Sequence, residues 1–257
     1  MSMAKSELIV LAVSSAMAVA AGLIGSFSIM RQMSLAADPM SHIALPGIGI
    51  ALLLGASPLI GAVAMLLCGA LLIWVVERRT HIATEAIIGV TFSVALAVGS
   101  MITSGEELIE ALFGSVSSLQ PWEVVLGLAA SLAVVTFVFC ARNALVVALI
   151  SPDLALTSKV NVSRLDLSFL LAFALTIGMG LRYLGVLLMG SLLIIPPAIG
   201  RRFARSLNGM LLISATIAVA ATVVGTWVAV LTGRQSGPLI VLVAGGLFFL
   251  SLAFRSR

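Results

Sequence analysis

A carboxylate and an imidazole lie four residues apart, at Asp38 and His42, at the start of an apolar segment. Asp38 is followed by Pro39, and proline is favoured at the first position of a helix, where its missing N–H removes no hydrogen bond. A helix that begins there stacks residues i and i+4 on one face. A carboxylate oxygen and a neutral imidazole nitrogen suit a divalent transition metal ion. The spacing therefore predicts a metal site; the alternative is that Asp38 caps a helix and His42 is a packed polar residue.

The composition is that of a polytopic membrane protein. Of the 257 residues, 61% are hydrophobic and 9% are charged, and the mean hydropathy of +1.24 lies far outside the range of soluble domains. We expect an all-α transmembrane bundle, with residues 1–257 forming a single domain. Apolar runs predict nine helices, at about residues 8–29, 39–55, 58–76, 85–103, 122–141, 165–181, 184–200, 210–232 and 237–254. Demoting the short second segment leaves eight.

The basic residues are unevenly divided between the two sides of this bundle. With the N-terminus outside, Lys5, Arg182 and Arg234 lie on the outer side, and the remaining lysines and arginines fall on the inner side. This arrangement satisfies the positive-inside rule and favours an odd number of spans. The arginines are spread among the loops rather than gathered on one face, so the net charge of +4 does not indicate a nucleic-acid partner.

Two adjacent prolines, Pro196 and Pro197, fall within the seventh predicted helix. Each removes one hydrogen bond from the helix, which frees the carbonyls of Leu192 and Leu193. In lipid, a freed carbonyl must be satisfied by protein or by a water-lined cavity. The two prolines therefore predict a break and a kink beside a transport pathway, with a purely structural kink as the alternative.

The inner loop at residues 151–164 is longer than a turn requires. It begins with Ser-Pro-Asp, which is typical of a helix start, and continues with small and apolar residues. A short amphipathic cytoplasmic helix of this kind would dock on a soluble partner, whereas the alternative is a loop that lies on the lipid headgroups. The candidate docking residues are Pro152, Asp153, Leu154, Ala155 and Leu156.

The sequence contains no motif that would drive transport or catalysis. Neither Lys5 nor Lys159 follows the glycine of a phosphate-binding Gly-Lys-Ser/Thr loop, and no G-x-S-x-G or H-E-x-x-H motif occurs. A proton-coupled carrier is expected to hold several ionisable residues in mid-span, whereas the acidic residues other than Asp38 lie at loop edges. We therefore expect a non-enzymatic pathway that a partner opens and closes.

Five blocks of sequence, spread along nearly the whole chain, form a recognisable set. They are Gly25-Ser26-Phe27 through Arg31-Gln32-Met33 to Asp38 and His42, Leu112-Phe113-Gly114, Ile150-Ser151-Pro152-Asp153-Leu154-Ala155, Gly185-Val186-Leu187 through Leu192-Leu193-Ile194-Ile195-Pro196, and Ser236-Gly237-Pro238-Leu239-Ile240-Val241-Leu242. In this order they resemble the membrane permease subunits of ABC transporters that import zinc, manganese or iron. The third and fourth blocks are most similar to the zinc-uptake permeases.

The resemblance implies a type II ABC importer-like permease in the bacterial cytoplasmic (inner) membrane. It implies a homodimer that works with two ATP-binding subunits, which hydrolyse the ATP, and with a periplasmic or surface metal-binding protein. Asp38 and His42 would line the ion path, and the loop at residues 153–161 would couple to the ATPase. No cofactor would be bound permanently, and the cargo would be Zn²⁺, or Mn²⁺ or Fe²⁺ as the nearest alternatives.

Two functions of other kinds also fit the sequence. A stand-alone secondary metal carrier would need no ATPase, so it would take up cations by itself in liposomes. A scaffolding membrane subunit would not depend on Asp38 or His42.

Overall fold

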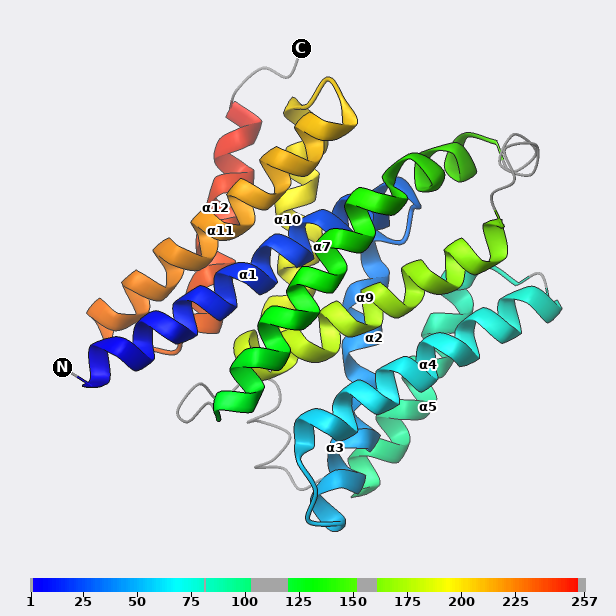
Figure 1. Cartoon of the computed structure of the whole chain (residues 1–257), viewed down its shortest axis with the longest axis horizontal. Coiled ribbons are helices and arrows are strands. Elements are labelled where there is room, and N and C mark those ends of the chain that lie inside the picture. The colour runs from blue at the N-terminus through cyan, green and yellow to red at the C-terminus, as the bar shows by residue number, and fades with distance from the viewer. Residues whose placement is uncertain (1, 81, 103–119, 152–160, 254–257) are drawn as a thin grey trace.

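The chain folds into a bundle of long helices. The computed structural model describes residues 2–80, 82–102, 120–151 and 161–253, and these residues form helices and no strands (Figure 1). The long helices are α1 (Ser2–Met30), α4 (Pro58–Thr80), α5 (Thr84–Ile102), α7 (Pro121–Ile150), α9 (Val162–Leu184), α10 (Val186–Phe203), α11 (Leu207–Thr232) and α12 (Ser236–Ala253). Three shorter elements lie between α1 and α4, namely η1 (Ser34–Ala36), α2 (Ala37–His42) and α3 (Ala44–Leu53).

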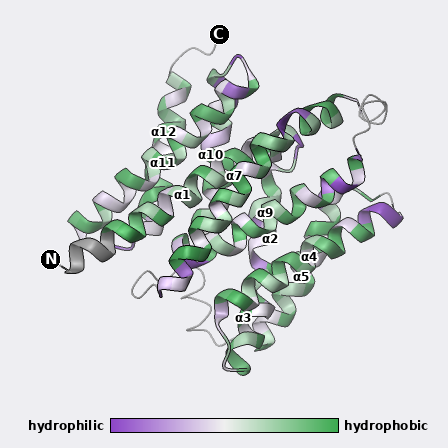
Figure 2. Ribbon diagram, in the orientation of Figure 1, coloured by the Kyte–Doolittle hydropathy of each residue, from purple (hydrophilic) through white to green (hydrophobic). Residues whose placement is uncertain are grey.

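Eight segments of the described chain are long and apolar enough to cross a membrane. They are the long helices other than α10, together with Ser34–Leu53, which joins η1, α2 and α3 into one span. The helix α10 adds a further 18 residues between α9 and α11. The prediction of an all-α bundle with eight or nine spans is therefore confirmed. Figure 2 shows hydrophobic residues along the helices and most of the hydrophilic residues near the helix ends.

The long helices place their ends at two opposite sides of the bundle. In Figure 1, the start of α1, the start of α7 and the end of α9 lie toward one side, and the opposite ends of these helices lie toward the other. We call the first side the outer end and the second the inner end, following the orientation that the distribution of basic residues predicts.

The helix α1 lies at the centre of the bundle. It packs against α7, α9, α10 and α11. The side chains of Val13, Met17, Ile24 and Phe27 are completely buried. Lipid would also accept an apolar helix, so the central place of α1 comes from its packing against these four helices.

The helix α7 is longer than predicted. It continues to Ile150, well beyond the predicted end near residue 141. Arg142 does not end the helix, and its Nη1 donates a hydrogen bond of 2.9 Å to Asn208 Oδ1 at the start of α11. At the other end, α7 begins with a capping box of Gln120 and Glu123, which satisfies backbone groups that the first turn leaves without partners.

The helix α10 is not interrupted at Pro196 and Pro197, so the predicted break is wrong. The helix runs without a gap from Val186 to Phe203. The carbonyl of Leu193, which Pro197 leaves free, lies against the backbone of α1, because a Cβ on Gly25 would overlap it. A glycine can approach a carbonyl this closely and make a weak C–H···O contact with it. Protein therefore covers this carbonyl, and a water-lined cavity is not required.

Candidate functional site

Asp38 and His42 lie one turn apart on α2, as their spacing predicts. The helix begins one residue before Asp38, and Pro39 is its third residue rather than its first. That position is still within the first turn, where backbone N–H groups lack helical partners. The N-cap residue is Ala36, with no side-chain capping hydrogen bond. The alternative role of Asp38 as a helix cap is therefore wrong.

The span that carries the pair has a one-residue break in its helical hydrogen bonding at Ile43, although the backbone there stays helical, with a φ of −62° and a ψ of −20°. A continuous helix over residues 39–55 is what the apolar run predicts, but α2 ends at His42 and α3 begins at Ala44. Pro46 explains the break, since it has no N–H to donate to the carbonyl of His42. A proline four residues after the histidine was the signal in the sequence that could have located this break.

The Asp38 side chain is exposed on a part of α2 that lies beside α10. Gly190 of α10 leaves room for it, because a Cβ at Gly190 would lie 3.6 Å from Asp38 Oδ1. Within the residues that the structure describes, the carboxylate has no hydrogen-bond or ion-pair partner. The Ser41 hydroxyl donates to the backbone carbonyl of Asp38 instead, at 2.6 Å. Both carboxylate oxygens are thus free to bind a cation.

The His42 ring is partly exposed and lies beside α5. Its centroid is 5.5 Å from that of the Phe92 ring, with an interplanar angle of 53°. The Nδ1 atom is buried and has no hydrogen-bond partner among the described residues. A buried polar atom without a partner costs about 1–3 kcal/mol.

One copy of the chain offers two metal donors at this site. Among the described residues, no group of three or more His, Cys, Asp or Glu side chains is close enough to hold a metal ion. Structural zinc sites use four protein ligands and catalytic zinc sites use three. Asp38 and His42 alone do not reach either number, and their binding of a metal ion stays a prediction.

The predicted docking residues lie outside the residues that the structure describes, and their role stays a prediction. They are Pro152, Asp153, Leu154, Ala155 and Leu156. The helix that precedes them, α7, ends at Ile150, and the helix that follows them, α9, begins at Val162. Both of these helix ends lie toward the inner end of the bundle (Figure 1).

Pro196 and Pro197 lie on the same helix as Gly190, the residue beside Asp38. Residues seven apart share one face of a helix, so Pro197 and Gly190 face the same side of α10, two turns apart. At Pro197 this side contacts α1, where the proline Cγ lies 3.0 Å from the position of a Cβ on Gly25. The prolines thus pack α10 on α1 two turns from Gly190, the residue beside Asp38. Their place in a pathway stays a prediction.

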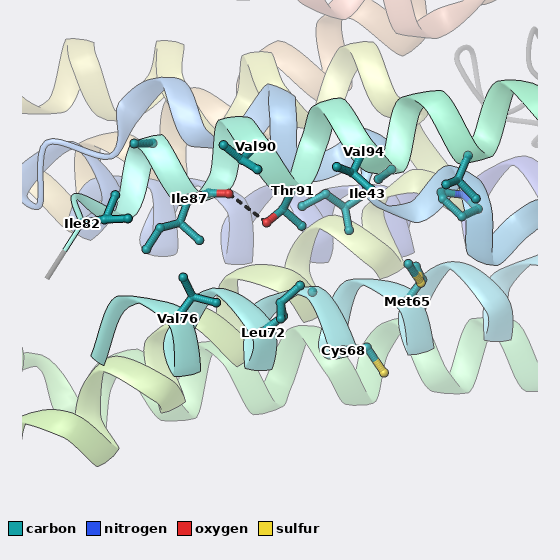
Figure 3. A pocket seen from close by; sticks show the side chains of 15 residues that line it. Ile43, Met65, Cys68, Leu72, Val76, Ile82, Ile87, Val90, Thr91 and Val94 are labelled. Atoms are coloured by element: carbon teal, nitrogen blue, oxygen red, sulfur yellow. Dashed lines mark hydrogen bonds between the residues drawn. The ribbon is translucent and has the colours of Figure 1, made fainter. Parts of the chain in front are cut away.

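An apolar cavity of about 630 Å³ lies between α4 and α5, close to the break in the second span (Figure 3). Ile43 and Pro46 line it at that break, and most of the other lining side chains are aliphatic. The hydroxyl of Thr91 is turned to its own helix and donates to the carbonyl of Ile87 at 2.8 Å. A lining of this kind suits hydrocarbon rather than ions, so the cavity is not part of the candidate metal site.

Comparison with known proteins relates the whole chain to transport permeases. The sequence model of the ABC 3 transport family matches residues 5–255. The manganese transport system membrane protein MntC of Listeria monocytogenes is 29% identical over 243 residues, which cover 93% of this chain and 87% of that protein. The high-affinity zinc uptake system membrane protein ZnuB of Haemophilus influenzae is 27% identical over 241 residues, covering 91% and 92%. The structure of PsaBC from Streptococcus pneumoniae in complex with Fab matches with a TM-score of 0.82 and 27% identity, covering 95% of this chain and 89% of that chain.

Proposed function

Because the chain belongs to the ABC 3 transport family, we propose that it is the membrane permease subunit of an ATP-driven importer of divalent transition metal ions. The observation that supports this function is the placement of Asp38 and His42 one turn apart, next to a break in the second span. Their side chains are of the types that Zn²⁺ and Mn²⁺ bind. Ionisable residues within membrane spans are rare and commonly mark an ion path.

Two copies of the chain form the ion path in this proposal. A charged residue at the centre of a span costs about 2.5–3.5 kcal/mol on insertion scales if it faces lipid. Asp38 is nevertheless exposed, which is consistent with a face that borders water or a second copy of the chain. Two copies related by two-fold symmetry supply two carboxylates and two imidazoles, and these four donors suffice for one metal ion.

The energy for transport comes from partner subunits. Two ATP-binding subunits bind at the inner side, where residues 152–156 act as the coupling segment, and a periplasmic or surface metal-binding protein delivers the ion on the outer side. The complex lies in a bacterial cytoplasmic membrane. ATP binding and hydrolysis rock the two permease copies, so that the path opens alternately to the outside and to the inside.

Asp38 and His42 bind the ion transiently as it moves along this path. The negative charge of Asp38 offsets the cost of bringing a cation into the membrane, and the imidazole of His42 replaces water in the ion's hydration shell. Since few donors hold the ion, it leaves readily when the inner side opens. The permease itself catalyses no reaction.

The transported ion is zinc or manganese. The sequence blocks resemble the zinc-uptake permeases most, whereas the relatives include one named for manganese and one named for zinc at similar identity. One imidazole and one carboxylate from each copy give a mixed N and O ligand set that both ions accept. The ratio of the two uptake rates therefore has to be measured.

The test is uptake of radioactive zinc and manganese into a bacterial strain that lacks its own importers for both metals. The chain is expressed together with its ATP-binding and metal-binding subunits. We expect Asp38→Ala and His42→Ala each to lower uptake of the cargo metal by about tenfold or more, at an unchanged amount of protein in the membrane. Leu35→Ala is the matched control, because Leu35 is exposed on the neighbouring η1 and carries no ligand atom.

Two outcomes would contradict this function. Normal uptake of both metals by both site variants would exclude the Asp38–His42 pair as part of the path. Metal uptake by the purified chain alone in liposomes, without ATP and without the ATP-binding subunits, would instead identify a secondary carrier.

A further inference from the structure

The helix α9 is held at each end by an ion pair to a different helix. At the outer end, Arg182 Nε lies 2.9 Å from Glu123 Oε1 of α7. At the inner end, Asp166 Oδ1 lies 2.8 Å from Nη1 of Arg31, which directly follows α1. Only the inner ion pair involves a residue close to the candidate site, because the chain continues from Arg31 to Asp38 and His42.

Arg31 is held by α9 through two contacts. Its side chain is only 12% exposed, and its guanidinium carbon lies 4.4 Å from the centre of the Phe169 ring. Phe169 is completely buried and follows Asp166 by about one turn of α9. A guanidinium that pairs with a carboxylate and stacks on a ring of the same helix is fixed in both direction and distance. A displacement of this end of α9 therefore displaces Arg31.

The chain from Arg31 to Asp38 is a tightly bonded connector. Gln32 has a positive φ of 62°, and the N–H of Met33 donates to the carbonyl of Ser28 at 2.9 Å. The Ser28 hydroxyl donates in turn to the Met33 carbonyl at 2.8 Å. These bonds close the end of α1 in the Schellman pattern, and η1 then leads directly into α2. The connector contains no loose loop that would absorb a displacement of Arg31.

The inner end of α9 lies close in sequence to the proposed coupling segment at residues 152–156. The side chain of Asn161 caps the helix by accepting a hydrogen bond from the N–H of Arg164 at 3.1 Å. The carbonyl of Ser163 accepts a hydrogen bond from Trp74 Nε1 of α4 at 3.0 Å. Asp166 lies in the following turn. A displacement at the start of α9 therefore reaches Asp166 along a short, well-capped stretch of helix.

We propose that the Arg31–Asp166 ion pair is the contact that couples the ATPase-facing part of the permease to the metal site. This inference rests on the proposed function. Movement at the inner end of α9 shifts Arg31, and the connector transmits that shift to α2 and to Asp38. The Glu123–Arg182 pair anchors the opposite end of α9. Arg31 and Asp166 are positioning residues, because they act on the ion path through α2.

The experiment measures metal imported per ATP hydrolysed by the complete transporter in liposomes, with zinc or manganese as the only transition metal. We expect Asp166→Asn to lower this ratio by about tenfold, because the complex still hydrolyses ATP but no longer moves the metal site. Asp166→Glu keeps the negative charge and is expected to restore the ratio to within about twofold of wild type. Glu123→Gln is the matched control, since it makes the same carboxylate-to-amide change at the other end of α9, and it should leave the ratio unchanged.

A double-mutant cycle tests whether the two residues act as a pair. Arg31→Gln should lower the ratio as much as Asp166→Asn does, and the double variant should lower it no further. If Asp166→Asn prevents assembly, Phe169→Leu takes its place and should lower the ratio about two- to fivefold by removing the ring beneath the guanidinium. An unchanged ratio, additive losses, or an equal loss in Glu123→Gln would overturn the proposal.

The experiments distinguish a failure of the coupling role from a failure of the proposed function. If uptake depends on Asp38 and His42 but the ratio in Asp166→Asn equals that of wild type, only the coupling role is wrong. If uptake does not depend on Asp38 and His42, the proposed metal path is wrong, and the coupling inference falls with it.

Discussion

Gly190 of α10 and Asp38 of α2 lie side by side, with 3.6 Å between the position of a Cβ on Gly190 and the Asp38 Oδ1 atom. That separation is an ordinary van der Waals contact, so alanine fits here, whereas a larger side chain must displace the carboxylate. We expect Gly190→Ala to keep metal uptake within about twofold of wild type and Gly190→Leu to lower it about tenfold or more. Gly246→Leu on α12 is the control, because nothing lies within 4 Å of a Cβ there. Equal uptake by the two leucine variants would contradict this prediction.

Gln32 adopts a left-handed backbone conformation, with a φ of 62°, at the end of α1. This conformation costs a β-branched residue about 1–2 kcal/mol, while glycine and asparagine adopt it readily. Glutamine already bears part of this cost, so we expect Gln32→Val to lower the free energy of unfolding by up to about 1 kcal/mol, and Gln32→Gly and Gln32→Asn to equal the wild-type value or exceed it by up to about 1 kcal/mol. Titration with SDS in mixed micelles measures the difference. A valine variant as stable as the glycine variant would show that this turn relaxes.

The sequence predicts the helices well, because each span is a long apolar run and the bilayer fixes its length. It predicts the end of α7 poorly. Arg142 resembles the end of an inner span, but the helix continues through the apolar residues 144–150. Leu145 is completely buried, and a pattern that stops at the charged residue does not reveal this packing.

The candidate site was predictable in its residues but not in its backbone. The four-residue spacing of Asp38 and His42 correctly predicts that they lie one turn apart. The break was expected at Pro196 and Pro197, where Gly25 of α1 covers the freed carbonyl of Leu193 and the helix continues. Helical hydrogen bonding is interrupted instead at Ile43, before Pro46, and the backbone there stays helical. Which proline breaks its helix depends on tertiary packing, and that information is absent from the local sequence.

Gly47 of α3 and Gly61 of α4 allow these two helices to touch through their backbones. A Cβ on Gly47 would overlap the carbonyl oxygen of Gly61, and a Cβ on Gly61 would overlap the carbonyl oxygen of Gly47. We expect alanine at either position to lower the free energy of unfolding by roughly 1–3 kcal/mol, since backbone atoms must move apart. Gly246→Ala is the matched control and should be neutral or up to about 1 kcal/mol more stable. If Gly47→Ala or Gly61→Ala behaves like this control, the close approach of α3 and α4 is wrong.

Glu123 joins the start of α7 to the end of α9. Its Oε2 accepts a hydrogen bond of 2.9 Å from the N–H of Gln120, its Oε1 accepts one of 2.9 Å from Arg182 Nε, and its backbone carbonyl accepts one from the Tyr183 hydroxyl. Removing one member of a buried ion pair costs about 3–5 kcal/mol, and the Arg182 side chain is 22% exposed. We therefore expect Glu123→Ala to lower the free energy of unfolding by about 3 kcal/mol, at the lower end of that range.

Glu123→Gln separates the hydrogen bonds of this residue from its charge. An amide oxygen still accepts from Gln120 or from Arg182, so the loss should be about 1 kcal/mol, the net worth of a hydrogen bond. Both variants are compared with wild type by the same SDS titration. The difference between wild type and glutamine measures the ion pair. Because the carboxylate and the guanidinium are partly shielded from solvent, this difference should persist in high salt, where an exposed ion pair would be screened. A glutamine variant as stable as wild type, or a difference between wild type and glutamine that salt removes, would mean that this ion pair contributes little to holding α9.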